Sequence, residues 1–208
     1  MIYESDLNIL QNSIKKRLSK KRFLHTLGVE KAARYIGKLC LPDKITELSA
    51  AALLHDVAKE LPSEQLLSLI TESRFDDLDD DDLATPALYH AFAAPPLIKK
   101  DFPAFASKEI LSAVFNHTSG SPDMTLFDEI IFVSDFVEEG RTYSACKEIR
   151  NKLYSTLTAR NELSKNISEL HKTTLEIINF TIEYLTKKGS AVNKRILLTK
   201  TSIFDKIN

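Results

Sequence analysis

Apolar residues recur along most of this chain with the three- or four-residue spacing of an α-helix, and this periodicity limits the fold more than any other feature. The first apolar stripe lies in residues 5–19 and consists of Leu7, Leu10, Ile14 and Leu18. Strictly alternating runs of β-branched residues, which would indicate strands, are scarce. The other ranges expected to be helical are 22–40, 44–58, 64–72, 86–93, 107–117, 124–139, 143–160 and 162–188. The sequence therefore predicts an all-α fold, a single helical bundle that spans residues 1–208.

Prolines, a glycine and an acidic stretch should interrupt these helices. Pro95 and Pro96 should end their helix early, because proline lacks a backbone donor and clashes in a helix interior. Gly189 should cap the last long helix. Residues 76–82 hold six aspartates around one leucine. We expect a solvated loop there, since the alternative, a cation-binding loop, would need the glycine-containing spacing of a calcium loop.

Charge and hydropathy exclude several classes of protein. With 28 Lys+Arg against 29 Asp+Glu the net charge is -1, so no overall basic field exists to hold nucleic acid. No apolar stretch approaches the roughly 20 residues that span a bilayer, and the N-terminus lacks the pattern of a signal peptide. Cys40 and Cys146 lie outside any CxxC pattern, which favours reduced thiols. We expect a cytoplasmic protein with no nucleic acid or membrane partner.

The pair His55-Asp56 is the strongest candidate for chemistry. It ends the apolar run AALLHDVA, where burial of either side chain is costly unless it is paired or bound to a metal. Adjacent helical residues point about 100° apart, so both side chains could reach one ion at the edge of the helix. Nitrogen and oxygen ligands together suit a borderline divalent transition metal. On its own, this dipeptide fits a polar pair satisfied within the protein at least as well.

Two further residues strengthen the metal interpretation. His25 lies one helix upstream, in RFLHTLGV, and Asp135 lies in the apolar segment IIFVSDFV. An aspartate inside an apolar helix should face a cation or a cluster of donors, because an uncompensated buried charge is expensive. Taken alone, His25 could be a structural histidine, and Asp135 could be a buried cap or an ion-pair partner. The order His, His-Asp, Asp across three helices indicates a common metal site.

This ligand order resembles the signature of the HD superfamily of metal phosphohydrolases. The similarity extends to four blocks within about residues 20–145, namely RFLHTLGVEKAA, AALLHDVAKELP, LYHAFAA and NHTSGSPDMTLFDEIIFVSDFVEEGR. In this order the blocks are similar to the YqeK family of bacterial HD-domain hydrolases, which are symmetrical bis(5′-nucleosyl)-tetraphosphatases. The resemblance implies cleavage of diadenosine tetraphosphate into two ADP. It also implies a metal-binding core at about residues 20–145, followed by C-terminal helices at about 146–208.

The resemblance further implies a centre that holds two iron ions. The ligands of the first iron would be His25, His55, Asp56 and Asp135. Asp56 would bridge to a second iron, whose further ligands would be His90 and His117. Without the resemblance, those last two would be core or loop histidines, and the ligand types alone would also accept manganese, zinc or cobalt. The fifth histidine, His171, lies among polar residues and is expected to be exposed.

Three basic residues near the blocks fit phosphate binding, although each alone could be a surface charge. Arg22 lies three residues before His25, so both project from one face of a helix. Lys59 lies three residues after Asp56, again on the same side, and Arg141 follows the last helix of the blocks. With the resemblance, the expected substrate-binding residues are Arg22, Lys59, His90, His117, Thr118 and Arg141. The expected catalytic residues are Asp56, Lys59, His90 and His117.

The hypothesis for the reaction is that a hydroxide formed at the two metals attacks a phosphorus in line with the leaving ADP. Two other functions stay open at this point. One is an HD hydrolase that acts on a mono-, cyclic or hyperphosphorylated nucleotide, and the other is a degenerate HD domain used for signalling or binding. A homodimer is also possible, because the C-terminal tail offers a partner copy the apolar residues Ile196, Leu197, Leu198, Ile203 and Phe204.

Overall fold

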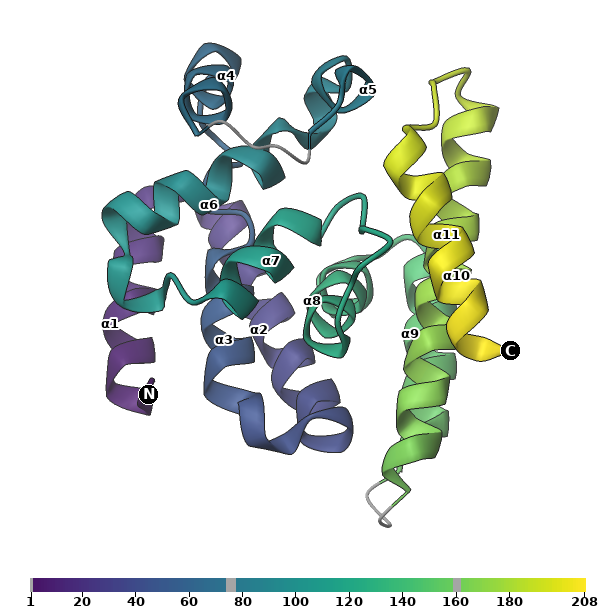
Figure 1. Cartoon of the computed structure of the whole chain (residues 1–208). Coiled ribbons are helices and arrows are strands. Elements are labelled where there is room, and N and C mark those ends of the chain that lie inside the picture. The colour runs from purple at the N-terminus through teal and green to yellow at the C-terminus, as the bar shows by residue number, and fades with distance from the viewer. Residues whose placement is uncertain (1, 74–77, 159–161) are drawn as a thin grey trace.

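The computed structural model describes residues 2–73, 78–158 and 162–208, in which all regular structure is helical (Figure 1). The α-helices are α1 (Glu4–Arg17), α2 (Lys20–Cys40), α3 (Ile45–Leu54), α4 (Ser63–Glu72), α5 (Asp80–Leu83), α6 (Tyr89–Asp101), α7 (Lys108–Asn116), α8 (Leu126–Val137), α9 (Ser144–Thr156), α10 (Leu163–Lys187) and α11 (Lys194–Ile207). Short 3₁₀ turns, each beginning with a proline, lie at η1 (Pro42–Lys44), η2 (Pro86–Leu88) and η3 (Pro103–Phe105). The all-α prediction is confirmed. Within the described ranges, no helix is both long enough and apolar enough to cross a membrane.

Helix α3 lies at the centre of the bundle and is enclosed by its neighbours. The residues Leu48–Leu54 are all buried, and the small side chains among them allow close packing. Gly37 of α2 permits one such approach, since a Cβ there would lie 2.5 Å from Leu48 Cδ1. Helices α1, α7 and α8 also contact α3. This enclosure brings His55 and Asp56, which follow α3 directly, into the interior of the protein.

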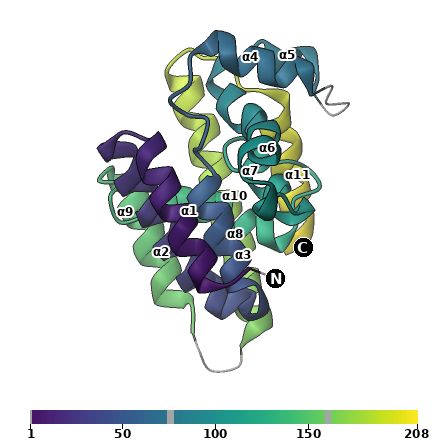
Figure 2. The ribbon, with the colours of Figure 1, turned by 90° about the vertical axis from the view of Figure 1, so that its left-hand side faces the viewer.

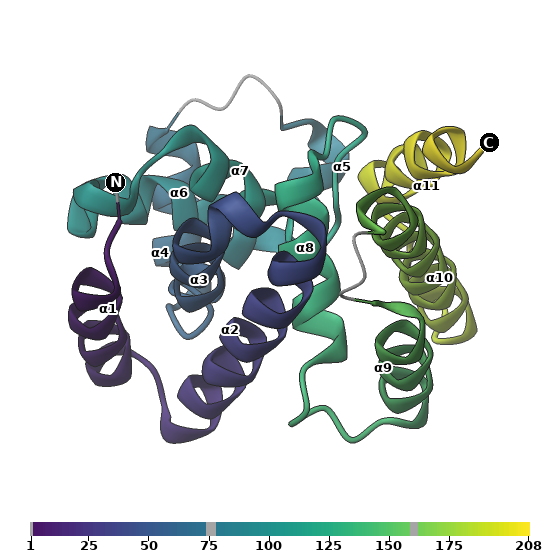
Figure 3. The same cartoon turned by 90° about the horizontal axis from the view of Figure 1, so that it is seen from below.

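Helix α8 lies between the central helices and the C-terminal ones. It contacts α2, α3 and α7, and it also contacts α9 and α10. Figure 3 shows α8 between α2 and α10, and Figure 2 shows α4 and α5 together at one end of the molecule. Side chains of α8 can therefore contact residues of the central helices on one side and residues of α10 on the other.

The expected early end of the helix at Pro95 and Pro96 is wrong. Helix α6 runs through both prolines to Asp101. A proline in a helix interior costs about 3 kcal/mol. The buried side chains around this site, Phe92, Leu97 and Ile98, stabilise the helix by about 1.5–3 kcal/mol each. Packing of α6 between α4 and α7 therefore outweighs the loss of the two backbone donors.

The expected solvated loop at residues 76–82 is wrong for its last residues, while residues 76 and 77 lie outside the described ranges. Asp79 caps α5, because its side chain accepts a hydrogen bond from the backbone N–H of Asp82. Asp82 is only 2% exposed, and its carboxylate lies 2.6 Å from Arg195 Nη2 of α11. A cation more than a hundred residues away in the sequence thus explains why this acid is buried.

The expected exposure of His171 is also wrong, because this residue belongs to a hydrogen-bonded network. Its Nδ1 lies 2.8 Å from Glu129 Oε2, and its side chain is 15% exposed. Glu129 is fully buried on α8, and it also accepts hydrogen bonds from Thr174 Oγ1 at 3.1 Å and Lys206 Nζ at 2.8 Å. The network ties α10 and α11 to α8.

The C-terminal tail packs largely on its own chain. Ile196 and Ile203 of α11 are buried, so these two residues are not available to a partner as expected. Leu197, Leu198 and Phe204 remain exposed. The division into a core at about residues 20–145 and C-terminal helices at about 146–208 stays a prediction, as does the homodimer. The final residues of the expected helix 143–160 lie outside the described ranges.

Candidate metal centre

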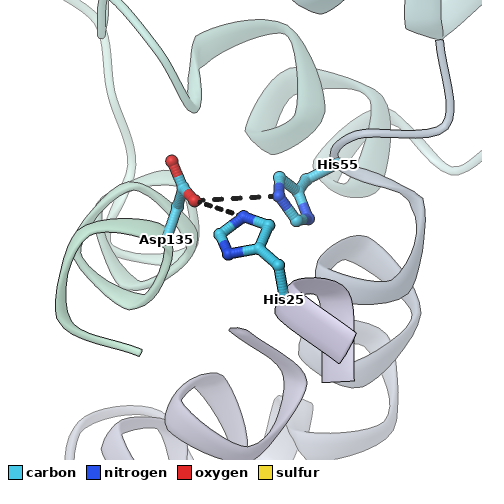
Figure 4. Close-up of side chains that lie close together, drawn as sticks. All are labelled: His25, His55 and Asp135. Carbon is cyan, nitrogen blue, oxygen red and sulfur yellow. Dashed lines mark ion pairs between the residues drawn. The ribbon is translucent and has the colours of Figure 1, made fainter. Parts of the chain in front are cut away.

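Three helices place a first group of ligand atoms together. His25 comes from α2, His55 follows α3, and Asp135 comes from α8 (Figure 4). One atom from each lies within 4.8 Å of the others. Asp135 Oδ1 is 2.9 Å from His25 Nε2 and 3.8 Å from His55 Nε2. Both Nε2 atoms are buried without a hydrogen-bond partner in the part of the chain described, because the short contact to Asp135 lacks hydrogen-bond geometry.

A second group of ligand atoms lies beside the first. His90 is in the first turn of α6, well before the two prolines, and His117 follows α7. Their Nε2 atoms are 3.2 Å apart. His117 also forms a cluster of potential metal ligands with His55 and Asp56, in which the atoms lie within 4.8 Å of one another. The structure thus brings all six predicted ligands to one place, although their binding of metal stays a prediction.

Asp56 divides its two carboxylate oxygens between these groups. Oδ2 lies 3.4 Å from His55 Nε2 and 3.7 Å from His25 Nε2. Oδ1 lies 3.6 Å from the Nε2 atoms of both His90 and His117. The carboxylate is 4% exposed. This is the arrangement expected of a carboxylate that bridges two cations.

Hydrogen bonds at Nδ1 orient three of the histidines so that Nε2 faces the centre. His55 Nδ1 lies 2.7 Å from the carbonyl oxygen of Ala52, and His117 Nδ1 lies 2.6 Å from that of Val114. A carbonyl can only accept, so Nδ1 must carry the proton and Nε2 keeps its lone pair. His25 Nδ1 faces the carboxylate of Glu138 at 3.1 Å in the same way. These bonds prepare Nε2 for a metal ion.

The charges in the centre also suit a cation. Burial would raise the pKa of Asp135, but the positive charge of Arg141 and the close contact with His25 hold it well below its usual value. Burial favours neutral His25, but its close contact with Asp135 and its hydrogen bond to Glu138 outweigh this effect and raise its pKa to about 9. A proton and a metal therefore compete for this imidazole. Burial, together with the charges of His117 and Lys59, lowers the pKa of His90 to about 2, so His90 is neutral at pH 7.

Three cationic side chains border the centre. Arg22 Nη1 donates to Asp56 Oδ2 at 2.7 Å, and Arg141 Nη2 donates to Asp135 Oδ1 at 2.6 Å. Lys59 Nζ lies 3.0 Å from His90 Nε2. Burial lowers the pKa of Lys59, although the two aspartates of the centre oppose this effect. The predicted substrate-binding residues all line one cavity of about 520 Å³, namely Arg22, Lys59, His90, His117, Thr118 and Arg141.

The sequence did not reveal Glu138 or the aromatic residues of the same cavity. Glu138 stands beside Glu139 in the segment VEEG, and nothing in that segment tells which glutamate is buried. The structure buries Glu138 at 3% exposure and leaves Glu139 exposed. The aromatic residues Phe136, Phe180 and Tyr184 also line the cavity. Only the side-by-side position of α8 and α10 brings these rings near the ligands.

Comparison with known proteins agrees with the fold and the ligand order. Residues 22–140 match the HD domain, so the chain belongs to the HD domain family. The chain is therefore an HD-domain hydrolase. A solved structure from Clostridium acetobutylicum, described as a "predicted HD superfamily hydrolase involved in NAD metabolism", superposes with a TM-score of 0.80 at 25% identity. That superposition covers 99% of this chain and 100% of the other.

Two relatives of named activity match over most of their lengths. The "Bis(5′-nucleosyl)-tetraphosphatase, symmetrical" of Bacillus subtilis (strain 168) is 29% identical over 188 residues, which are 89% of this chain and 91% of the relative. The protein of the same name from Staphylococcus aureus (strain NCTC 8325 / PS 47) is 27% identical over 88% of this chain and 87% of the relative. Both alignments extend well beyond the matched HD domain.

Proposed function

We propose that this protein is a metal-dependent hydrolase that cleaves diadenosine tetraphosphate symmetrically into two ADP. The activity named for the two relatives supports the substrate, because they match about nine tenths of the chain. The structural support rests on Asp56, whose two oxygens face two separate histidine groups. Paired metal sites of this kind suit displacement at phosphorus.

The donor atoms fit two divalent transition metals, and we assign iron to both sites. The first would be held by His25, His55, Asp56 and Asp135, and the second by Asp56, His90 and His117. The unpartnered Nε2 atoms of His25 and His55 support this fit, since buried nitrogens need a partner. When bound, such metals act as Lewis acids and lower the pKa of a coordinated water toward neutrality.

The cationic residues would bind and orient the phosphate chain. A guanidinium has five N–H donors, so Arg22 can hold Asp56 and donate to a phosphate oxygen at the same time. Arg141 can do the same while it holds Asp135. Lys59 adds a positive charge beside His90, and the Thr118 hydroxyl lies 3.2 Å from His90 Nε2. Together these groups would offset the negative charge on the transferring phosphoryl group.

A substrate panel tests this function against other HD hydrolases and against a degenerate binding module. Iron-loaded protein should hydrolyse diadenosine tetraphosphate faster than mononucleotides, cyclic nucleotides or hyperphosphorylated nucleotides. Asp56→Asn, prepared in parallel, should be inactive on all of them, since it removes the charge shared by both sites. A preference for one of the other classes would contradict the proposed substrate. A protein that binds no transition metal by elemental analysis, even after reconstitution, would contradict the proposed enzyme.

A further inference from the structure

The cavity that holds the metal centre has a second, aromatic part. Besides the ligands and the cations, it is lined by Phe136, which directly follows Asp135 on α8, and by Phe180 and Tyr184 of α10. Tyr143, from the segment between α8 and α9, lines it as well. We call these four residues the aromatic wall. None of these four residues belongs to the predicted metal ligands or to the cations assigned to phosphate binding.

Three of the four rings form a continuous series that starts with Phe136, the residue after Asp135. Phe136 meets Phe180 edge to face, with ring centroids 5.6 Å apart. Phe180 lies nearly parallel to Tyr184, at 6.3 Å between centroids and 20° between planes. Ile177, Phe180 and Tyr184 share one face of α10 and span about 10 Å along its axis. The series thus leads along the cavity lining from Phe136 of α8 to Tyr184 of α10.

The exposure of the two tyrosines of the wall indicates a ligand and not a folding role. Tyr143 is 75% exposed and Tyr184 is 48% exposed, so folding leaves much of their surface in water. Single exposed aromatics are common, but several that gather in one cavity beside a polar centre are typical of a ligand site. The charge distribution agrees, because the only carboxylates among the described lining residues are Asp56 and Asp135 at the centre. The wall therefore suits a flat, uncharged group that is joined to an anionic one.

We propose that the aromatic wall binds the nucleobase of one half of the substrate by stacking, while the attached phosphates lie along Arg22, Lys59 and Arg141. This inference rests on the proposed function and adds the residues that hold the nucleoside. A purine offers a π-face to the rings of Tyr143, Phe180 and Tyr184, whose stacking is tolerant of base identity. Because the two halves of the dinucleotide are identical, either base can occupy the wall.

The test compares a ligand that has a base with one that lacks it. Isothermal calorimetry on metal-loaded protein measures the binding of ADP and of inorganic pyrophosphate to Tyr143→Leu, Phe180→Leu and Tyr184→Leu. Each substitution should weaken ADP binding by about 5- to 160-fold, the range for loss of one base–aromatic stack, and should leave pyrophosphate binding unchanged. Phe204→Leu is the matched control, since this exposed ring on α11 does not line the cavity. It should change neither affinity.

The possible outcomes separate this inference from the proposed function. Unchanged ADP binding in all three wall variants would overturn the inference. An equal loss of ADP and pyrophosphate affinity would also overturn it, because that pattern indicates a general distortion of the site. Because Tyr143 and Tyr184 are exposed, their substitution should not unfold the protein, and a thermal melting curve of each variant checks this. If ADP affinity falls selectively while wild-type protein fails to hydrolyse the dinucleotide, the wall stands and the proposed function fails.

Discussion

Glu138 should control the metal affinity of the centre without touching the metal. Its Oε1 accepts a hydrogen bond from His25 Nδ1 at 3.1 Å, and its Oε2 accepts one from the backbone N–H of Gly140 at 2.5 Å. In Glu138→Gln one oxygen becomes an NH₂ group, which must then face a donor on one of these two sides. A hydrogen bond to a charged group contributes about 1.5–3 kcal/mol. The substitution should therefore weaken the hydrogen bond that orients His25. In metal sites generally, loss of a carboxylate that hydrogen-bonds a ligand histidine lowers the affinity for the metal.

The expected result is a 10- to 100-fold lower metal affinity, which corresponds to about 1.4–2.7 kcal/mol. Competition with a chromophoric chelator measures it on purified full-length protein. The matched control is Glu139→Gln, because the neighbouring Glu139 is 62% exposed and contacts only Lys31, at 2.7 Å, among the ion pairs of the described residues. This control should stay within about 2-fold of wild type, since exposed pairs contribute little. Equal affinities of Glu138→Gln and wild type would contradict this role of Glu138, and so would equal losses in both variants.

Other variants test the centre and the attachment of the C-terminal helices. Asp56→Asn should lower kcat/KM at least about 100-fold, more than loss of an outer hydrogen bond, because it removes a charge that faces four histidines; near-normal steady-state kinetics would contradict this. Arg195→Met should destabilise the fold by about 3–5 kcal/mol in urea unfolding, because it leaves the Asp82 carboxylate buried without its cation. Glu129→Gln should destabilise it by about 1.5–3 kcal/mol at pH 7. Burial would raise the pKa of Glu129, but hydrogen bonds from its histidine and lysine partners lower it below the usual 4.5. The Glu129 carboxylate thus stabilises the fold above about pH 4.5, and this stabilisation is lost as the pH falls through its lowered folded-state pKa. The difference in unfolding free energy between wild type and Glu129→Gln should therefore shrink in acid, and a difference that grows in acid would contradict this.

Local patterns were sufficient to predict most of the helices, although not α5 and α11, and to single out the residues that the structure gathers at one place. Apolar periodicity correctly predicted the ranges of α1, α2 and α10 to within a few residues. Gly189 follows the end of α10 with a positive φ of 69°, as expected of a glycine cap. The adjacent His55-Asp56 pair stood out because two polar side chains ended an apolar run. Each of these signals lies within a few residues of the feature that it predicts.

The expectations that proved wrong concern features that depend on contacts between residues far apart in the sequence. Asp82 looked solvated because its partner Arg195 is on the last helix. His171 looked exposed because nothing near it indicates the buried Glu129. The prolines of α6 should have ended a helix in isolation, but neighbouring helices bury and hold it. Tertiary packing, which one sequence does not display, decided all three cases.

If the proposed function is right, this centre cleaves the phosphate chain of a dinucleoside tetraphosphate in the middle and needs metal to do so. The most direct measurement is ion-exchange chromatography of the nucleotides formed from diadenosine tetraphosphate by iron-loaded protein, before and after removal of the metal with a chelator. ADP should be the sole nucleotide product, no reaction should occur after chelation, and activity should return when iron is restored. Formation of ATP together with AMP, or hydrolysis that continues without metal, would contradict it.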